Sequence, residues 1–184
     1  MSAVSTPCVI VISGLPGAGK STTARLVAAG LDRAAHVEAD RLQDMVVAGR
    51  VLPDGTPSPG PEAEAQLALR LRNACLLARS FVGSGFSAVV DDIVLADRLD
   101  AAARGLAGLD VRFVMLAPDY DHLRRRWVEA GSPFADAWRW IEDLRLATPR
   151  VGLWLDTTHM TAPEAAATIV ARLDEARWAV GSSG

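Results

Sequence analysis

Residues 14–22 read Gly14-Leu15-Pro16-Gly17-Ala18-Gly19-Lys20-Ser21-Thr22 and have the spacing G-x-x-x-x-G-K-[ST], which is typical of a phosphate-binding loop. The apolar run Cys8–Ile12 directly precedes this loop and predicts a buried strand, and the following residues predict a helix from Lys20 to Leu31. Glycines let successive backbone N–H groups converge on one anion, and the N-terminal end of a helix adds positive potential. We therefore expect Gly14–Thr22 to bind the phosphates of a nucleotide.

Two side chains of this loop have predicted roles in phosphate chemistry. Lys20 is expected to reach the β- and γ-phosphates of ATP, and the Ser21 hydroxyl is expected to ligate Mg²⁺. Lys20 is also the single lysine among 19 basic residues, because all the others are arginines. A compact ammonium kept at this one position favours the phosphate role. ATP and Mg²⁺ are therefore the expected cofactors.

The composition is that of a globular protein. The chain has 184 residues, of which 50% are hydrophobic and 22% charged, and this length suits one α/β domain over residues 1–184 with a flexible tail at 181–184. A net charge of −3 makes nucleic acid an unlikely partner, and no apolar run is long enough for a membrane span, so we expect a cytoplasmic protein. Cys8 and Cys75 are expected to be free buried thiols. The oligomeric state stays open.

Apolar runs and helical periodicity alternate along the rest of the chain. The patterns predict further strands at 36–39, 86–90, 111–116 and 151–155, and helices at 61–82, 97–106, 120–130, 134–146 and 161–173. Thr161 and Glu164 have the spacing of a capping box at the start of the last helix. Alternating strands and helices predict an α/β fold with a five-stranded parallel sheet, helices on both faces and right-handed crossovers.

Carboxylates follow two of the predicted strands. Asp40 follows the strand at 36–39, and Asp91 and Asp92 follow the strand at 86–90, where ligands bind in open α/β sheets. We expect Asp40 to contact the acceptor hydroxyl as a catalytic base, although its position also suits an N-cap. One of Asp91 and Asp92 is expected to bind Mg²⁺ or its water, while the other faces the opposite side of the sheet. Asp92 is also a candidate contact for the acceptor. The alternative for the pair is a structural role in a turn or as a helix cap.

Two segments in the middle of the chain are candidates for binding the acceptor. Gln66, Arg70 and Asn73 form a polar stripe along the predicted helix 61–82, and Arg70 and Asn73 are the candidate contacts; a hydrated helix edge is the alternative. The stretch at 50–61 holds four prolines and two glycines, so it predicts a long loop. This loop either covers the acceptor or is a surface excursion.

An arginine-rich helical hairpin is predicted at 119–146, with Arg124, Arg125 and Arg126 on its first helix. A mobile lid of this kind can close over a nucleotide so that its arginines neutralise charge on the transferring phosphoryl group. Arg124 and Arg126 are therefore candidate catalytic residues. A solvated basic face is the alternative.

The chain resembles the P-loop kinases of small molecules, and most of all the chloramphenicol phosphotransferase-like group. The resemblance lies in the order of five features: the phosphate-binding loop, Asp40, the pair Asp91-Asp92, the arginine-rich lid and Asp156-Thr157-Thr158-His159. The resemblance implies transfer of the γ-phosphate of ATP to a hydroxyl of a small molecule, such as an antibiotic or other natural product, with Asp40 acting toward that hydroxyl. Other acceptors, namely a sugar acid, a nucleoside or an RNA end, remain open. So does a nucleotide-dependent switch, although the chain has no second lysine for the N-K-x-D stretch of guanine-specific switches.

Overall fold

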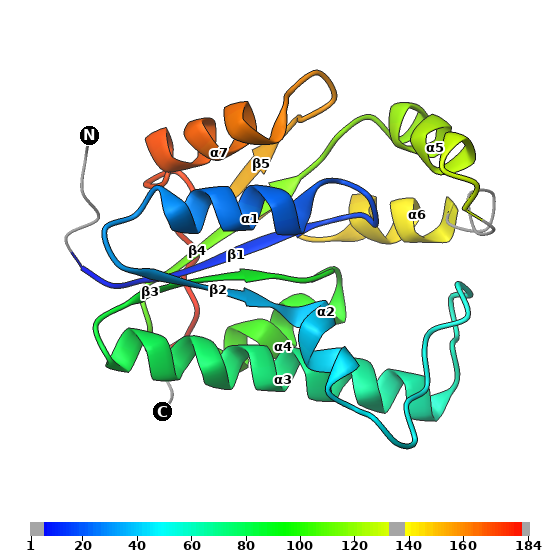
Figure 1. Cartoon of the computed structure of the whole chain (residues 1–184), viewed down its shortest axis with the longest axis horizontal. Coiled ribbons are helices and arrows are strands. Elements are labelled where there is room, and N and C mark those ends of the chain that lie inside the picture. Colours follow the sequence, from blue (N-terminus) through cyan, green and yellow to red (C-terminus); the bar gives the residue numbers. More distant parts are fainter. Residues whose placement is uncertain (1–5, 133–138, 182–184) are drawn as a thin grey trace.

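The computed structural model describes residues 6–132 and 139–181. Its centre is a parallel sheet in the order β2-β3-β1-β4-β5 (Figure 1). The strands are β1 (Val9–Gly14), β2 (Ala34–Glu38), β3 (Ser87–Asp91), β4 (Val111–Leu116) and β5 (Leu153–Leu155). The predicted five-stranded parallel sheet is therefore confirmed.

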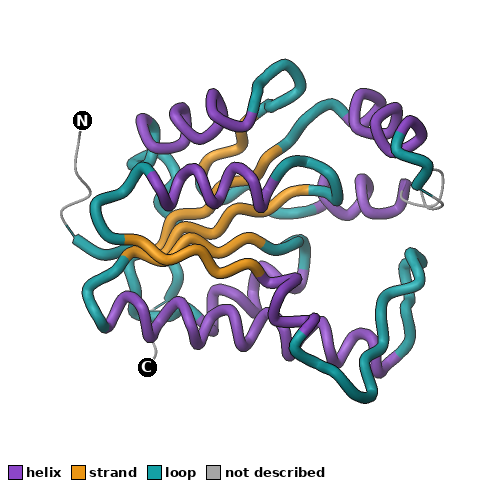
Figure 2. The backbone as a smooth tube through the Cα atoms, viewed as in Figure 1, coloured by secondary structure: helices purple, strands orange, loops and turns teal. Residues whose placement is uncertain are grey.

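Helices cover both faces of the sheet, as predicted. The helices are α1 (Lys20–Ala29), α2 (Ala39–Asp44), α3 (Pro61–Gly83), α4 (Asp97–Gly105), α5 (Tyr120–Glu129), α6 (Arg139–Ala147) and α7 (Ala162–Ala171). α1 and α7 lie on one face, and α3 and α4 lie on the other (Figure 1). α5 and α6 lie beyond the ends of the strands, on the side where the loop after α2 also rises (Figure 2).

The central strand β1 separates two hydrophobic cores. All six of its residues are buried, which explains why its sequence is a continuous apolar run instead of an alternating one. Val9 and Val11 belong to the core under α3 and α4, whereas Ile10 and Ile12 belong to the core under α1 and α7. The strand therefore fixes the phosphate-binding loop, which follows it directly, between two packed layers.

The structure shortens some predicted elements. β5 begins at Leu153 instead of residue 151, because Gly152 has a φ of 61°, which is outside the extended region of a strand. A Cβ at this position would lie 2.2 Å from the Phe113 carbonyl oxygen, so the turn requires glycine. The predicted helix at 134–146 is described from Arg139, and its first residues lie outside the described part of the chain. The capping box of Thr161 and Glu164 at the start of α7 is confirmed.

Other sequence expectations concern the cysteines and membrane spans. Cys8 and Cys75 are free and buried, as predicted, and burial raises the pKa of the Cys75 thiol to about 11. Within residues 6–132 and 139–181, no helix combines the length and the apolar composition that crossing a membrane requires.

Candidate functional site

The phosphate-binding loop connects β1 to α1 in a tight conformation. Gly17 and Gly19 have φ angles of 73° and 87°, in the left-handed region that favours glycine. A Cβ on Gly17 would lie 2.8 Å from the indole Nε1 of Trp127, and this nitrogen donates a hydrogen bond of 3.0 Å to the Pro16 carbonyl. Trp127 therefore holds α5, the first helix of the expected lid, against the phosphate-binding loop.

A cavity of about 340 Å³, called here the phosphate cavity, is lined by this loop and by three predicted acids, Asp40, Asp91 and Asp92. The acids come from the ends of β2 and β3, which are neighbours in the sheet. The structure therefore brings the predicted nucleotide-binding residues and the predicted carboxylates to one place. Among the nucleotide-binding candidates, Lys20, Ser21 and Thr22 open α1 at the margin of this cavity.

Lys20 lies among backbone oxygen atoms and carboxylates. Its Nζ donates a hydrogen bond of 3.0 Å to the Leu15 carbonyl. Burial lowers the pKa of Lys20, while Asp92, Asp40 and Asp91 act in the opposite direction. An ammonium that has lost much of its hydration gains more from contact with phosphate oxygens than an exposed one does.

Asp91 contacts α1 and β2. The Ser21 hydroxyl donates to its Oδ2 at 2.6 Å, and the His36 Nε2 lies 2.6 Å from its Oδ1. Because a carboxylate only accepts, the histidine donates. Ser21 and Asp91 supply the oxygen atoms that Mg²⁺ prefers. Among the described residues no three acidic, histidine or cysteine side chains form a group that could hold a metal ion.

Asp92 faces the other side of the sheet, toward α3, where its carboxylate accepts a hydrogen bond from Arg70. The second guanidinium nitrogen of Arg70 donates to Asp40 Oδ1 at 3.0 Å. The side chain of Arg70 is only 9% exposed, so a hydrated helix edge is the wrong description of this residue. Arg70 therefore joins two of the predicted site carboxylates.

The other members of the polar stripe have different places. Gln66 is also buried, accepts from Val51 N at 2.9 Å and donates to the Gly49 carbonyl at 2.8 Å. It therefore anchors the start of the proline-rich loop. Asn73 is half-buried and lines neither the phosphate cavity nor the second cavity described below.

Asp40 lies in the first turn of α2, which begins at Ala39. The N-cap position belongs to Glu38, so the alternative that Asp40 caps this helix is wrong. The Asp40 side chain is 76% exposed, and in the part of the chain that the structure describes its Oδ2 has no hydrogen-bond partner. One carboxylate oxygen is thus fixed by Arg70, and the residue lines the phosphate cavity.

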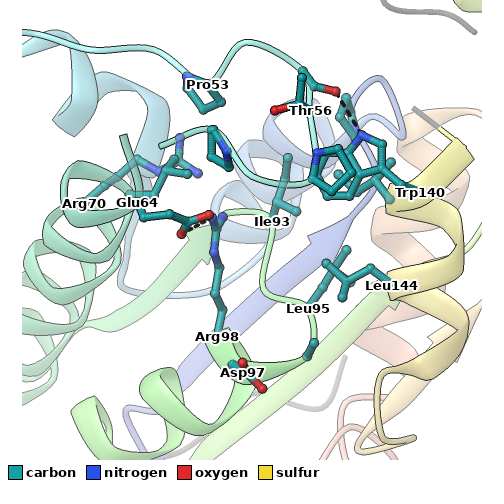
Figure 3. A pocket seen from close by; sticks show the side chains of 17 residues that line it. Pro53, Thr56, Glu64, Arg70, Ile93, Leu95, Asp97, Arg98, Trp140 and Leu144 are labelled. Carbon is teal, nitrogen blue, oxygen red and sulfur yellow. Dashed lines mark hydrogen bonds and ion pairs between the residues drawn. The ribbon is translucent and has the colours of Figure 1, made fainter. Parts of the chain in front are cut away.

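Figure 3 shows a second cavity of about 430 Å³, called here the acceptor cavity. It adjoins the first cavity, since Pro16 and Ile93 line both. Its walls come from the proline-rich loop, α3, the segment after β3 and α6. The Trp140 indole of α6 donates a hydrogen bond of 2.9 Å to the Gly55 carbonyl of the loop. Of the two alternatives for this loop, the structure therefore favours a cover over a cavity.

The lid arginines lie farther out. Arg124, Arg125 and Arg126 of α5 are exposed, and none of them lines either cavity. In α6, Arg145 is buried and paired with Glu142. A phosphate contact by Arg124 or Arg126 thus stays a prediction.

Three side chains of this region have no role in the predictions from the sequence. They are His36, Trp127 and Trp140. Only their positions in the sequence could have indicated a role. His36 lies two residues before the end of β2, and each tryptophan lies within an arginine-rich helix. Their partners depend on tertiary packing.

Comparison with known proteins identifies the family. A family model described as chloramphenicol phosphotransferase-like protein matches residues 7–174. The chain belongs to this family. No curated protein matches the chain significantly.

Solved structures with similar folds include three kinases, and this chloramphenicol phosphotransferase-like chain is 20–21% identical to them. An APS kinase of Mycobacterium tuberculosis in complex with AMPPNP and APS is 21% identical, with a TM-score of 0.65 over 92% of this chain and 98% of that one. A gluconokinase of Sinorhizobium meliloti 1021 is 20% identical, with a TM-score of 0.61 over 91% and 92%. A sugar kinase of Janibacter sp. HTCC2649 is 21% identical, with a TM-score of 0.61 over 92% and 96%. The fold is therefore that of P-loop small-molecule kinases.

Proposed function

We propose that this protein is a kinase that transfers the γ-phosphate of Mg·ATP to a hydroxyl group of a small molecule bound in the acceptor cavity. The observation that carries this proposal is the junction of the two cavities at Pro16 and Ile93, with Asp40 and Arg70 beside it. A phosphate donor and an organic acceptor can thus meet at one point. The APS kinase solved with AMPPNP and APS, which binds a nucleotide and a second ligand together, gives support from a similar fold.

Each site residue has a role in this proposal. The backbone N–H groups of the loop and Lys20 bind the phosphates and hold them in place. Ser21 and Asp91 would hold Mg²⁺, which neutralises negative charge on the phosphates. The free oxygen of Asp40 accepts the proton of the acceptor hydroxyl, while Arg70 fixes the other oxygen and so orients the carboxylate.

The walls of the acceptor cavity support an organic acceptor. Prolines of the loop, Leu67, Leu144 and the Trp140 ring give it a mainly apolar surface. Small-molecule sites usually combine such a surface with a few placed polar groups. An antibiotic or other natural product with a free hydroxyl fits this description.

The proposal is tested by measuring ADP formation from Mg·ATP with a panel of hydroxylated natural products, and by ³¹P NMR of the products. We expect a phosphate monoester that appears only with an acceptor whose hydroxyl is free. The O-methylated form of the same acceptor is the matched control. ATP hydrolysis that responds to a protein partner, with no acceptor phosphorylated, would instead support a nucleotide-dependent switch.

His36 provides a prediction about Mg²⁺. Its hydrogen bond holds Asp91 in the orientation that also meets Ser21. His36→Leu should therefore raise the Mg²⁺ concentration needed for half-maximal nucleotide binding by about tenfold to a hundredfold, the effect expected of residues that orient metal ligands. Nucleotide binding without Mg²⁺ should change little. His36→Gln can restore a donor and should recover most of the affinity. Equal Mg²⁺ dependence in the wild type and His36→Leu, measured by calorimetry, would contradict this role.

The lid arginines provide a second prediction. If Arg124 or Arg126 contacts the transferring phosphoryl group when the lid closes, its replacement by alanine should lower kcat by about tenfold to a hundredfold with a smaller change in ATP affinity. Arg104→Ala, which removes an exposed arginine of α4, is the control. Small and equal effects on kcat and ATP affinity would indicate a solvated basic face.

A further inference from the structure

The first residues of the phosphate-binding loop form a β-turn. The Ala18 N–H donates a hydrogen bond of 3.1 Å to the Leu15 carbonyl, four residues being spanned by this bond. Pro16 and Gly17 are therefore the two central residues of the turn. Proline cannot take a positive φ, which excludes the mirror-image turns, and the Gly17 φ of 73° excludes type I. The turn is therefore of type II.

The peptide between Pro16 and Gly17 is the part of this turn that can be reversed. Types I and II differ by a flip of the central peptide, and both suit proline followed by glycine, because glycine adopts either sign of φ. The peptide is trans, so its carbonyl and its N–H point in opposite directions. A flip would thus replace an N–H by a carbonyl oxygen on one side of the loop, and a carbonyl oxygen repels phosphate.

Trp127 of α5 holds this peptide in one of its two orientations. Its indole Nε1 donates a hydrogen bond of 3.0 Å to the Pro16 carbonyl, and the side chain is only 5% exposed. Trp127 lines neither cavity, so the carbonyl is bound by a group outside the phosphate cavity. Gly17 does line that cavity, and within residues 6–132 and 139–181 its N–H has no hydrogen-bond acceptor. A donor is therefore left unpaired where phosphate is expected.

We propose that Trp127 is a positioning residue for phosphate binding, because its indole N–H holds the central peptide of the turn so that the Gly17 N–H is available to a phosphate oxygen. The inference rests on the proposed function, since it assigns the loop to the phosphates of the nucleotide. Because Trp127 belongs to α5, the affinity for those phosphates depends on the contact between this lid helix and the loop.

The experiment removes only the hydrogen-bond donor. In Trp127→3-benzothienylalanine the two fused rings are kept and sulfur replaces the indole N–H. Binding of inorganic tripolyphosphate to the full chain, without Mg²⁺ or acceptor, is measured by calorimetry. We expect the affinity to fall about threefold to tenfold, the size of effect that follows from the loss of one hydrogen bond.

The same replacement at Trp178 is the matched control. Trp178 is a buried tryptophan of the core under α3 and α4 and lines neither cavity, so its isostere should bind tripolyphosphate as the wild type does. Unchanged affinity in the Trp127 isostere would overturn the proposal. A loss of affinity in Trp127→Phe alone would also overturn it, because packing of the larger ring would then be the cause.

A measurement on the wild type tests the same link without a substitution. Coupling between two sites is reciprocal, so bound tripolyphosphate should slow exchange of the Trp127 indole N–H with water, followed by NMR, by about threefold to tenfold. Equal exchange rates with and without tripolyphosphate would overturn the proposal even if the variants did not fold. Absence of tripolyphosphate binding by the wild type would overturn both this inference and the proposed function. Absence of phosphoryl transfer with binding intact would count against the proposed function alone.

Discussion

Replacement of Lys20 by alanine should lower phosphoryl transfer on the order of 10³-fold, in the range found when a group that stabilises transition-state charge is removed. The ammonium is the single lysine of the chain, lies in the phosphate cavity and has a pKa lowered by burial. Contact with the β- and γ-phosphates therefore restores electrostatic stabilisation that solvent does not provide, and this stabilisation grows as charge develops during transfer. Initial rates at saturating Mg·ATP and acceptor measure the effect.

The control for this variant is Arg25→Ala, which removes one positive charge from the exposed side of the same helix. It should leave the rate within about twofold of the wild type, because exposed charges outside the cavity are screened by salt. Thermal unfolding of both variants shows whether the fold is kept. Wild-type turnover by a folded Lys20→Ala protein would exclude the kinase proposal.

The sequence predicts the parts of this site that depend on local structure. The loop at Gly14–Thr22 needs only a buried strand before it and a helix after it, and both are visible as apolar patterns of different period. The alternation of side chains along a strand likewise predicts that Asp91 and Asp92 face opposite sides of the sheet, and they do so, toward α1 and toward α3. These features are encoded within a few neighbouring residues.

The contacts that complete the site depend on which elements become neighbours. His36 meets Asp91 only because β2 pairs with β3, and strand periodicity does not specify the order of strands in a sheet. For Arg70 the sequence leaves two roles open, an acceptor contact or a hydrated helix edge, because periodicity gives the face of a helix but not the partners that this face meets. The Trp140 contact with Gly55 likewise joins α6 to a loop 85 residues away in the sequence.

The position of Asp40 shows how such tertiary contacts change the interpretation of a residue. The sequence leaves two roles for this carboxylate, a catalytic base or a helix cap, and the structure removes the second because Glu38 occupies the cap position. The contact with Arg70 then fixes one oxygen of Asp40, a residue that lines the phosphate cavity. In the proposed reaction, this arrangement would hold a base in a defined orientation next to the acceptor.

Substitution of Asp40 by asparagine should lower turnover by about 10²–10⁴-fold, the range expected for the loss of a general base. Asparagine keeps the size of the side chain and one oxygen that can accept from Arg70, so folding and ATP binding should stay close to wild type. The amide cannot take up the proton of the acceptor hydroxyl at neutral pH. The rate should therefore fall in kcat, with little change in the KM for ATP.

Asp44→Asn is the matched control, since Asp44 lies in the same short helix and forms an exposed ion pair with Arg50. That pair contributes little to stability, and Asp44 lines neither cavity, so this variant should turn over at nearly the wild-type rate. If Asp40→Asn instead matches the wild type, Asp92 becomes the next candidate base, because it lies on the other side of the same guanidinium and lines the same cavity. Asp92→Asn would then carry the loss of kcat, and Arg70 would serve to hold that carboxylate toward the acceptor.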